Sequence, residues 1–217
     1  MRALRHCFVE NDLDWWKRIE LAQEQLANQL VEGWRSGVLD HMRQIPVKES
    51  QSSMDDDAES KELPSEKLVV YGATSINLAI TPEAVFLAQL GDGDVVVVGQ
   101  DGKARRSVPT DARLFANETT SLCSPNAEAV VRCMIEPIEG DSAPELVLVA
   151  TDGYANSFAS DDDFLLVATD LREMILEESF DDVAGQLKVW LEEASEQGSG
   201  DDITAGLLYH NRRNASS

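Results

Sequence analysis

Two short apolar segments of this sequence each place carboxylates at the end of a predicted strand. The segment 146–150 leads into Asp152, and Asp201 and Asp202 directly precede the segment 203–208. Short apolar runs bounded by turn residues are typical of buried strands. A carboxylate at the junction of a strand and a turn can hold a hard cation. Together the two segments predict a shared metal centre that contains Asp152 and Asp201.

Ordinary turn chemistry is the alternative explanation for each segment alone. Asp152 is followed by Gly153, and in an Asp-Gly turn the Asp caps its own backbone while the Gly takes a positive φ. The second segment follows a predicted helix end and the glycine-rich turn 198–200, so that a helix, a turn, an acidic pair and a strand come in succession. Two such segments together favour the metal centre over two unrelated turns.

Composition predicts one main globular domain with an acidic surface. The 217 residues are 43% hydrophobic and 27% charged, which is enough apolar material for one sizeable core. Lys and Arg number 18 against 40 Asp and Glu, so the formal net charge is −22. Such a charge repels nucleic acid and anionic membranes, and we expect neither as a partner.

The cysteines and the apolar runs favour a cytoplasmic protein. Cys7, Cys123 and Cys133 are odd in number and lack the Cys-x-x-Cys spacing, so neither a disulfide framework nor a zinc knuckle is predicted. No apolar run approaches the roughly eighteen residues that a membrane-spanning helix needs, and the N-terminus lacks the apolar region of a signal peptide.

Apolar periodicity divides the chain into four parts. Residues 1–45 form an N-terminal helical part, 46–66 an acidic flexible insertion that contains Asp55–Asp57, 67–210 the main body, and 211–217 a disordered tail. The first helix is predicted over 12–42, because apolar residues recur there at steps of three and four. These residues are Trp15, Ile19, Ala22, Leu26, Leu30, Trp34 and Val38.

Strands and helices of the main body come in blocks, which predicts an α+β fold with antiparallel sheets. Strands are expected at 68–73, 75–80, 85–90, 94–98 and 104–108, and helices at 126–134, 164–176 and 180–194. The segment 81–83 and the Asp-Gly pair at 101–102 are expected to form hairpin turns.

Five short motifs, in this order, resemble the metal-dependent protein phosphatases, the type-2C serine/threonine phosphatase family. They are Tyr-Gly-Ala-Thr at 71–74, Ala-Gln-Leu-Gly-Asp-Gly at 88–93, Asn-Glu-Thr-Thr-Ser-Leu at 117–122, Ala-Thr-Asp-Gly at 150–153 and Asp-Asp-Ile-Thr at 201–204. The resemblance implies a four-layer α-β-β-α sandwich of antiparallel sheets. It also implies Mn²⁺ or Mg²⁺ at one edge and hydrolysis of phosphoserine and phosphothreonine by metal-activated water.

The resemblance also implies which residues bind metal. Asp152 and Asp201 match the carboxylates that ligate the first metal, and Asp92 matches one that helps hold a weaker third metal, although Gly93 stands where the family usually has Ser. Carboxylates are the ligands that Mg²⁺ and Mn²⁺ prefer, which agrees with these roles. The alternative for Asp92 is a tight hairpin turn in Gly-Asp-Gly-Asp.

Departures from the family pattern leave two functions open. Residues 1–66 contain no Asp-Gly, so neither the bridging Asp-Gly-x-Gly motif nor the phosphate-binding Arg is found, and the domain is expected to be N-terminally incomplete. A partner chain or a homo-oligomer would then cover the missing sheet edges. The first function is a phosphatase acting on a phosphoprotein, and the second is a noncatalytic interaction module that binds a kinase or a phosphoprotein.

Overall fold

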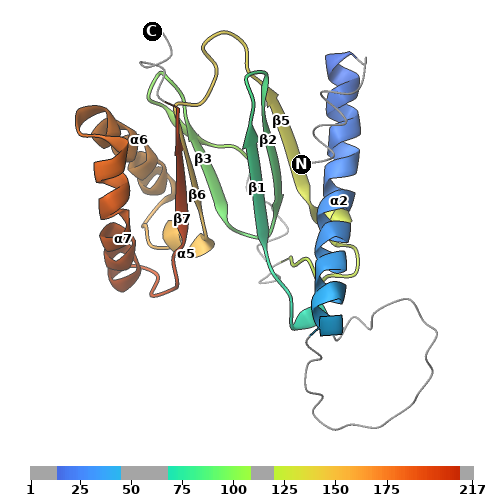
Figure 1. Ribbon diagram of the computed structural model, residues 1–217. Helices are drawn as coiled ribbons and strands as arrows, with labels where there is room; N and C mark the ends of the chain where they lie inside the picture. The colour runs from blue at the N-terminus through green and yellow to red at the C-terminus, as the bar shows by residue number, and fades with distance from the viewer. Residues whose placement is uncertain (1–13, 45–67, 109–119, 211–217) are drawn as a thin grey trace, which may run out of the picture. The chain divides into compact units, whose positions relative to one another are not determined.

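The computed structural model describes residues 14–44, 68–108 and 120–210 (Figure 1). The predicted insertion 46–66, the tail 211–217 and the start of the 117–122 motif lie outside these residues. The helices are α2 (Trp15–Gln44), α4 (Ala127–Val130), α5 (Asp152–Ala155), α6 (Asp161–Glu177) and α7 (Phe180–Gln197). The strands are β1 (Ser75–Ile80), β2 (Ala84–Leu90), β3 (Asp94–Val98), β4 (Ala104–Arg106), β5 (Arg132–Pro137), β6 (Leu146–Ala150) and β7 (Ala205–Tyr209).

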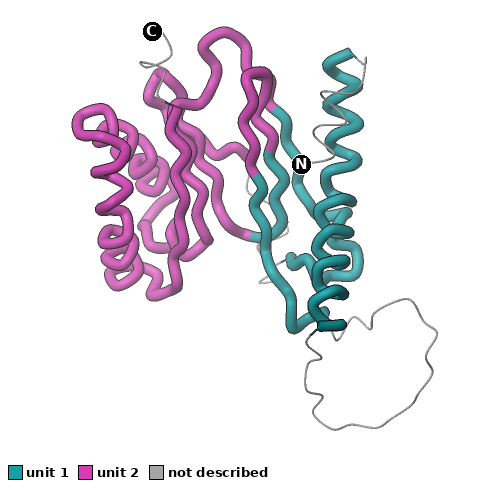
Figure 2. The backbone as a smooth tube through the Cα atoms, viewed as in Figure 1, with its two compact units in different colours: residues 1–77, 87–91, 118–135 teal, residues 78–86, 92–117, 136–217 magenta. Residues whose placement is uncertain are grey.

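The described strands form two sheets, and the chain divides into two compact units (Figure 2). One sheet has the order β1-β2-β5 and the other the order β4-β3-β6-β7. The pairs of the four-stranded sheet are all antiparallel, with Val96 opposite Leu148 and Leu148 opposite Leu207. The predicted α+β class with antiparallel sheets is therefore confirmed. Among the described residues, no helical segment combines the length and the hydrophobicity that spanning a bilayer requires.

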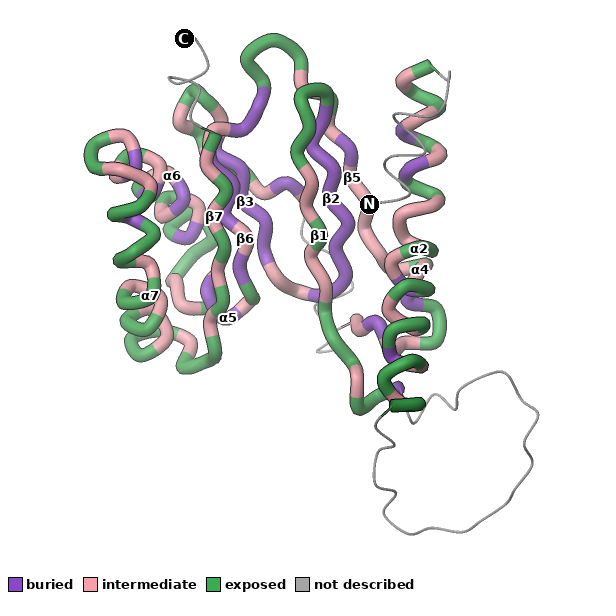
Figure 3. Tube along the Cα trace, viewed as in Figure 1, coloured by how far each residue is buried: buried purple, intermediate pink, exposed green. Residues whose placement is uncertain are grey.

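The core of the second unit forms where α6 and α7 pack against the four-stranded sheet. The stripe of α6 that faces the sheet repeats at helical spacing, and the sheet presents alternate residues of β3 and β6 to it. Figure 3 shows this burial along β3 and β6. The fully or nearly fully buried members of this core are Val96, Val98, Leu146, Leu148, Ala150, Tyr154, Phe164, Ala168, Leu171, Ile175 and Val183.

Serine caps fix the first turns of both long helices in this unit. The Ser160 hydroxyl accepts a hydrogen bond from the Asp163 amide of α6 at 3.1 Å, and the Ser179 hydroxyl accepts one from the Asp182 amide of α7 at 3.1 Å. Each cap satisfies an amide that has no partner within the helix. The acidic residues in these first turns also interact favourably with the helix dipole.

The first unit contains α2. Of the seven residues in its predicted apolar stripe, Ile19, Ala22 and Val38 are buried and the other four are half-buried. Val31, which the predicted stripe did not include, is buried as well. Val31 belongs to a cluster with Leu90, Leu122 and Ala127, which joins α2 to β2 and α4.

Three predicted elements differ from the structure. The strand predicted at 68–73 is wrong: Leu68 and Val69 end a helical turn, and the Tyr71 amide donates to the Leu68 carbonyl at 2.9 Å. A short apolar run does not distinguish a strand from a helix, because both can produce it. The helix predicted at 126–134 is limited to 127–130 and gives way to β5, and the strand predicted at 104–108 ends at 106.

Both predicted hairpin turns are present. In the 81–83 turn, the Thr81 hydroxyl accepts a hydrogen bond from the Ala84 amide at 3.0 Å. The Asp-Gly turn joins β3 to β4, and Gly102 has φ +77°, a conformation that L side chains rarely adopt.

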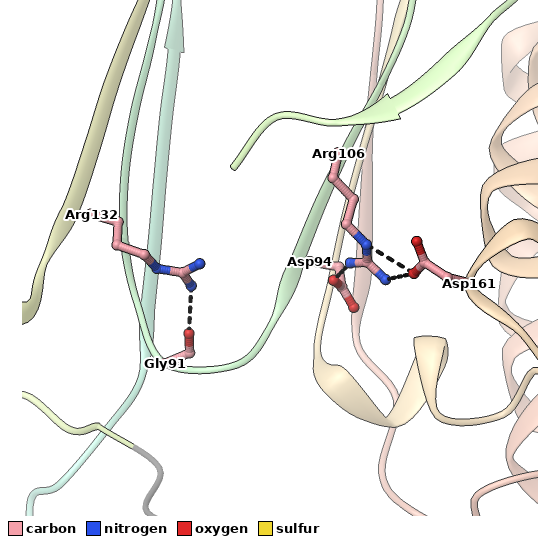
Figure 4. A network of polar contacts seen from close by, with 5 residues as sticks. All are labelled: Gly91, Asp94, Arg106, Arg132 and Asp161. Atoms are coloured by element: carbon pink, nitrogen blue, oxygen red, sulfur yellow. Dashed lines mark hydrogen bonds and ion pairs between the residues drawn. The ribbon is translucent and has the colours of Figure 1, made fainter. Parts of the chain in front are cut away.

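An ion-pair network ties β3, β4 and α6 together (Figure 4). Arg106 of β4 pairs with Asp94 at the start of β3 and with Asp161 at the start of α6. Its guanidinium also lies over the Phe164 ring, 5.2 Å from the centroid. The side chains of Arg106 and Asp94 are only 20% and 11% exposed, so this pair is shielded from solvent.

We expect Arg106→Met to destabilise the fold much more than Arg105→Met. Removing Arg106 leaves Asp94 buried without its charge partner, which costs about 3 kcal/mol in the free energy of unfolding. Arg105 is 54% exposed and pairs with Glu136, so its loss should cost less than about 1 kcal/mol. Urea unfolding of both variants measures the difference, and equal losses would contradict a structural role for the shielded pair.

Candidate functional site

The N-terminus of α5 is held against the segment that leads into β7. Beyond the last residue of β6, the Thr151 amide donates to the Thr204 carbonyl at 2.9 Å. The Thr204 amide in turn donates to the Thr151 hydroxyl at 2.9 Å. The pairing of β6 with β7 thus continues one step past the strand ends, and it brings Asp152 beside the loop that contains Asp201.

Gly153 allows this close approach because it has no side chain. A Cβ at Gly153 would lie 3.1 Å from the Asp202 carbonyl oxygen and 3.2 Å from the Asp201 Cβ. Gly153 is not among the described glycines with positive φ, and Asp152 and Gly153 open a short helix. The explanation of Asp152-Gly153 as a positive-φ turn is therefore wrong, and the glycine serves close packing instead.

Two serines that the sequence did not point to fasten α5 to the end of α7. The hydroxyls of Ser157 and Ser199 both donate to the Gly153 carbonyl, at 2.8 and 2.9 Å, and lie 3.0 Å from each other. Gly198 ends α7 against Ser157, and a Cβ there would lie 2.6 Å from the Ser157 Cα. The glycine-rich stretch signalled a turn in the sequence, but nothing indicated that Ser157 would meet it.

Two of the predicted carboxylates, Asp92 and Asp201, come within electrostatic reach of the third, Asp152. Burial raises the pKa of Asp152, the negative charge of Asp92 raises this pKa further, and Asp201 adds a smaller effect in the same direction. The backbone amide of Gly153 opposes them by stabilising the carboxylate. The fold therefore gathers negative charge from three separate chain segments at the N-terminus of α5.

Asp92 comes from a connection between the two sheets. Gly91 precedes it with φ +101°, and a Cβ at Gly91 would overlap the Thr74 side chain, so only glycine fits there. Arg132 donates from Nη2 to the Gly91 carbonyl at 2.9 Å (Figure 4). Because this connection leads from β2 of one sheet to β3 of the other, the alternative of a tight hairpin turn at Asp92 is wrong.

The described residues supply carboxylate ligands for a hydrated cation but no complete coordination shell. Among residues 14–44, 68–108 and 120–210, no three His, Cys, Asp or Glu side chains stand in a metal-coordinating arrangement. Asp201 accepts a hydrogen bond from the Asp202 amide at 2.8 Å, and Asp152 accepts one from Asn156 at 3.4 Å. Mg²⁺ commonly binds through one or two carboxylates and keeps several waters, and this donor set fits such an ion.

Replacing Gly198 by Ala is expected to destabilise the contact between α5 and the end of α7. The new methyl group would overlap the Ser157 main chain, and such overpacking costs about 1–3 kcal/mol. Gly185 offers a matched control, because it lies within α7 and a Cβ there meets nothing within 4 Å. Gly185→Ala should stabilise the helix by up to about 1 kcal/mol. Opposite signs in thermal unfolding support the assigned contact, and a loss in both variants contradicts it.

The raised pKa of Asp152 predicts a pH-dependent stability of the metal-free protein. The folded state binds the proton more tightly than the unfolded chain, so this stabilisation is fully present below the unfolded pKa and is lost as pH rises through the folded pKa. Asp152→Asn should therefore match the wild type in acid and exceed its stability at neutral pH. Urea unfolding in EDTA at several pH values tests this, and identical pH slopes would exclude the effect.

A family model for protein phosphatase 2C matches residues 1–192 of this chain. The matched residues contain Asp92 and Asp152, whereas Asp201 lies beyond them. Comparison with the sequences of curated proteins gives no match.

Solved structures of bacterial phosphatases resemble this chain at low sequence identity. A bacterial serine phosphatase variant is 16% identical with a TM-score of 0.46, and the alignment covers 64% of this chain and 54% of that one. The serine/threonine phosphatase of S. agalactiae is 20% identical with a TM-score of 0.44, covering 64% and 60%. The catalytic domain of PstP, with two manganese ions, is 15% identical with a TM-score of 0.44, covering 85% and 81%. This chain thus spans less than two thirds of the length of the first two.

Proposed function

This chain belongs to the protein phosphatase 2C family, and from that premise we propose that it hydrolyses phosphoserine and phosphothreonine in proteins with the help of Mn²⁺ or Mg²⁺. The observation that carries the proposal is the packing of Asp201 against Gly153, beside Asp152, with Asp92 within electrostatic reach of Asp152. In this proposal Asp152 and Asp201 hold the ion and Asp92 assists.

Electrostatics supports a cation at this position. The carboxylates of Asp92 and Asp201 each repel that of Asp152, and a divalent cation is the partner that relieves this repulsion most directly. A phosphate dianion would itself be repelled by these carboxylates, in a protein of net charge −22. When bound, the ion supplies charge neutralisation for the phosphoryl group and acidifies water.

The neighbouring residues hold the carboxylates in place. Asn156 donates to Asp152 at 3.4 Å, and the Asp202 amide donates to Asp201 at 2.8 Å, so each carboxylate has one oxygen engaged by the protein. The hydroxyls of Ser157 and Ser199 fix the Gly153 carbonyl and with it the first turn of α5. These contacts orient the proposed ligands without any bound ion.

A noncatalytic interaction module is the second candidate. It is favoured by the absence, among the described residues, of a complete three-ligand cluster. Such a module keeps the fold and at most a weakly held ion, and binds a kinase or a phosphoprotein without turnover.

Metal binding and hydrolysis distinguish the two candidates. In the wild type, millimolar Mn²⁺ should raise the melting temperature and support hydrolysis of a phosphothreonine peptide. Asp152→Asn and Asp201→Asn should each lose most of the metal-induced shift and lower the hydrolysis rate by about a hundredfold or more. Asp170→Asn, an exposed site on α6, is the matched control and should retain both.

Each result decides between the two functions. Hydrolysis that needs Mn²⁺ and both aspartates supports the phosphatase. A folded chain that binds Mn²⁺ but releases no phosphate supports the module. A chain whose melting temperature does not respond to Mn²⁺ or Mg²⁺ would refute the assigned metal site.

A further inference from the structure

Asp92 lies between two glycines, so its own segment does not fix its orientation. Gly91 and Gly93 have no side chains, and glycine adopts both signs of φ with similar ease. Gly91 itself has φ +101°. Residues 91–93 belong to no helix or strand and connect the end of β2 to the start of β3. The orientation of Asp92 must therefore come from contacts with other parts of the chain.

The register of β3 and β6 explains why Asp92 comes near Asp152. Asp94, the first residue of β3, lies opposite Ala150, the last residue of β6, in an antiparallel pair. Asp92 precedes Asp94 by two positions, and Asp152 follows Ala150 by two positions. Both aspartates therefore leave the four-stranded sheet at the same end, which agrees with the effect of the Asp92 charge on Asp152.

The segment 91–94 is anchored at its C-terminal end by Arg106. The Asp94 carboxylate pairs with this arginine and is only 11% exposed. Because the pair is shielded from solvent, it holds the start of β3 in place. It leaves the peptide groups of the two glycines free to rotate, so Asp92 needs a second anchor on its other side.

Arg132 supplies an anchor at the N-terminal end of the segment. The Ile138 amide, just beyond β5, donates to the Glu83 carbonyl, just before β2, at 2.8 Å. These neighbouring strands thus run antiparallel, and the start of β5 lies beside the end of β2. From this position Arg132 donates from Nη2 to the Gly91 carbonyl at 2.9 Å (Figure 4). A hydrogen bond from a charged donor is stronger than one between neutral groups.

We propose that Arg132 positions Asp92 for metal binding by fixing the peptide group between Gly91 and Asp92. This peptide group is planar, so a hydrogen bond to its carbonyl oxygen also orients the amide and the Cα of Asp92. Arg132 acts through Asp92 and is not a metal ligand, since a guanidinium has no acceptor atom. The proposal rests on the proposed function, in which Asp92 assists the ion.

The sign of the effect on metal binding separates positioning from charge. Arg132 is a cation, and removing a cation from the neighbourhood of a metal site by itself strengthens the binding of a divalent cation. Losing the orientation of Asp92 weakens that binding instead. Weaker binding of Mn²⁺ after removal of Arg132 therefore cannot be a charge effect.

The orientation of Asp92 can be measured by NMR in EDTA, without metal or substrate. Three-bond couplings should show one χ1 rotamer for Asp92 in the wild type and an average over rotamers in Arg132→Met. The matched control is Arg35→Met, because Arg35 also donates to a carbonyl of a distant segment, that of Ser124, at 3.5 Å. A loss of stability alone would affect both variants alike. An Asp92 rotamer that is unchanged in Arg132→Met would overturn the proposal.

Binding of Mn²⁺, measured by the EPR signal of the free ion, tests the consequence for the metal site. Arg132→Met should weaken binding by about tenfold, as is typical for residues that orient a metal ligand. Arg132→Lys keeps a charged donor and should bind within about twofold of the wild type. Arg35→Met should bind like the wild type. Unchanged or tighter binding by Arg132→Met would contradict the positioning role.

A double-mutant cycle shows whether Arg132 acts through Asp92. Asp92→Asn alone should weaken Mn²⁺ binding by about tenfold. The variant that carries both Arg132→Met and Asp92→Asn should also lose about tenfold, whereas independent effects would multiply to about a hundredfold. A hundredfold loss would show that Arg132 acts on the ion by another route, and it would overturn the proposal.

The outcomes separate this inference from the proposed function. A wild type that binds no Mn²⁺, with an Asp92 rotamer that still depends on Arg132, would refute the phosphatase and leave the orientation of Asp92 by Arg132 established. Hydrolysis that needs Mn²⁺ but is the same in Arg132→Met as in the wild type would overturn the positioning role and leave the phosphatase intact.

Discussion

The close approach of Gly153 to the Asp201 Cβ and the Asp202 carbonyl oxygen is the constraint on which the candidate site depends. It requires a residue without a side chain at the first turn of α5. It also requires that the loop between α7 and β7 pass directly against this residue. Ser157 and Ser199 complete the contact by sharing the Gly153 carbonyl. Because α5, the end of α7 and the start of β7 meet there, a shift in any of these elements would separate the aspartates.

Periodicity and turn residues predicted the elements whose burial pattern is regular. The stripes of α2, α6 and α7 and the runs of β2, β3 and β6 stand out because one face or both faces are buried. The apolar run at 68–73 led to a wrong strand prediction. Its valines have high β propensity, but Val69 and Val70 are exposed and belong to no strand. Asp152 and Asp201 could be paired from their strand ends. Contacts between distant segments, such as Arg106 with Asp94 or Ser157 with Ser199, leave no local pattern and could not be predicted.

In the proposed function, the negative charge of this protein opposes the binding of a phosphate ester. The −22 net charge repels a phosphate dianion over the range of the Debye length, about 8 Å in physiological salt, and the aspartates repel it at contact. A bound divalent cation reverses the sign of the field only locally.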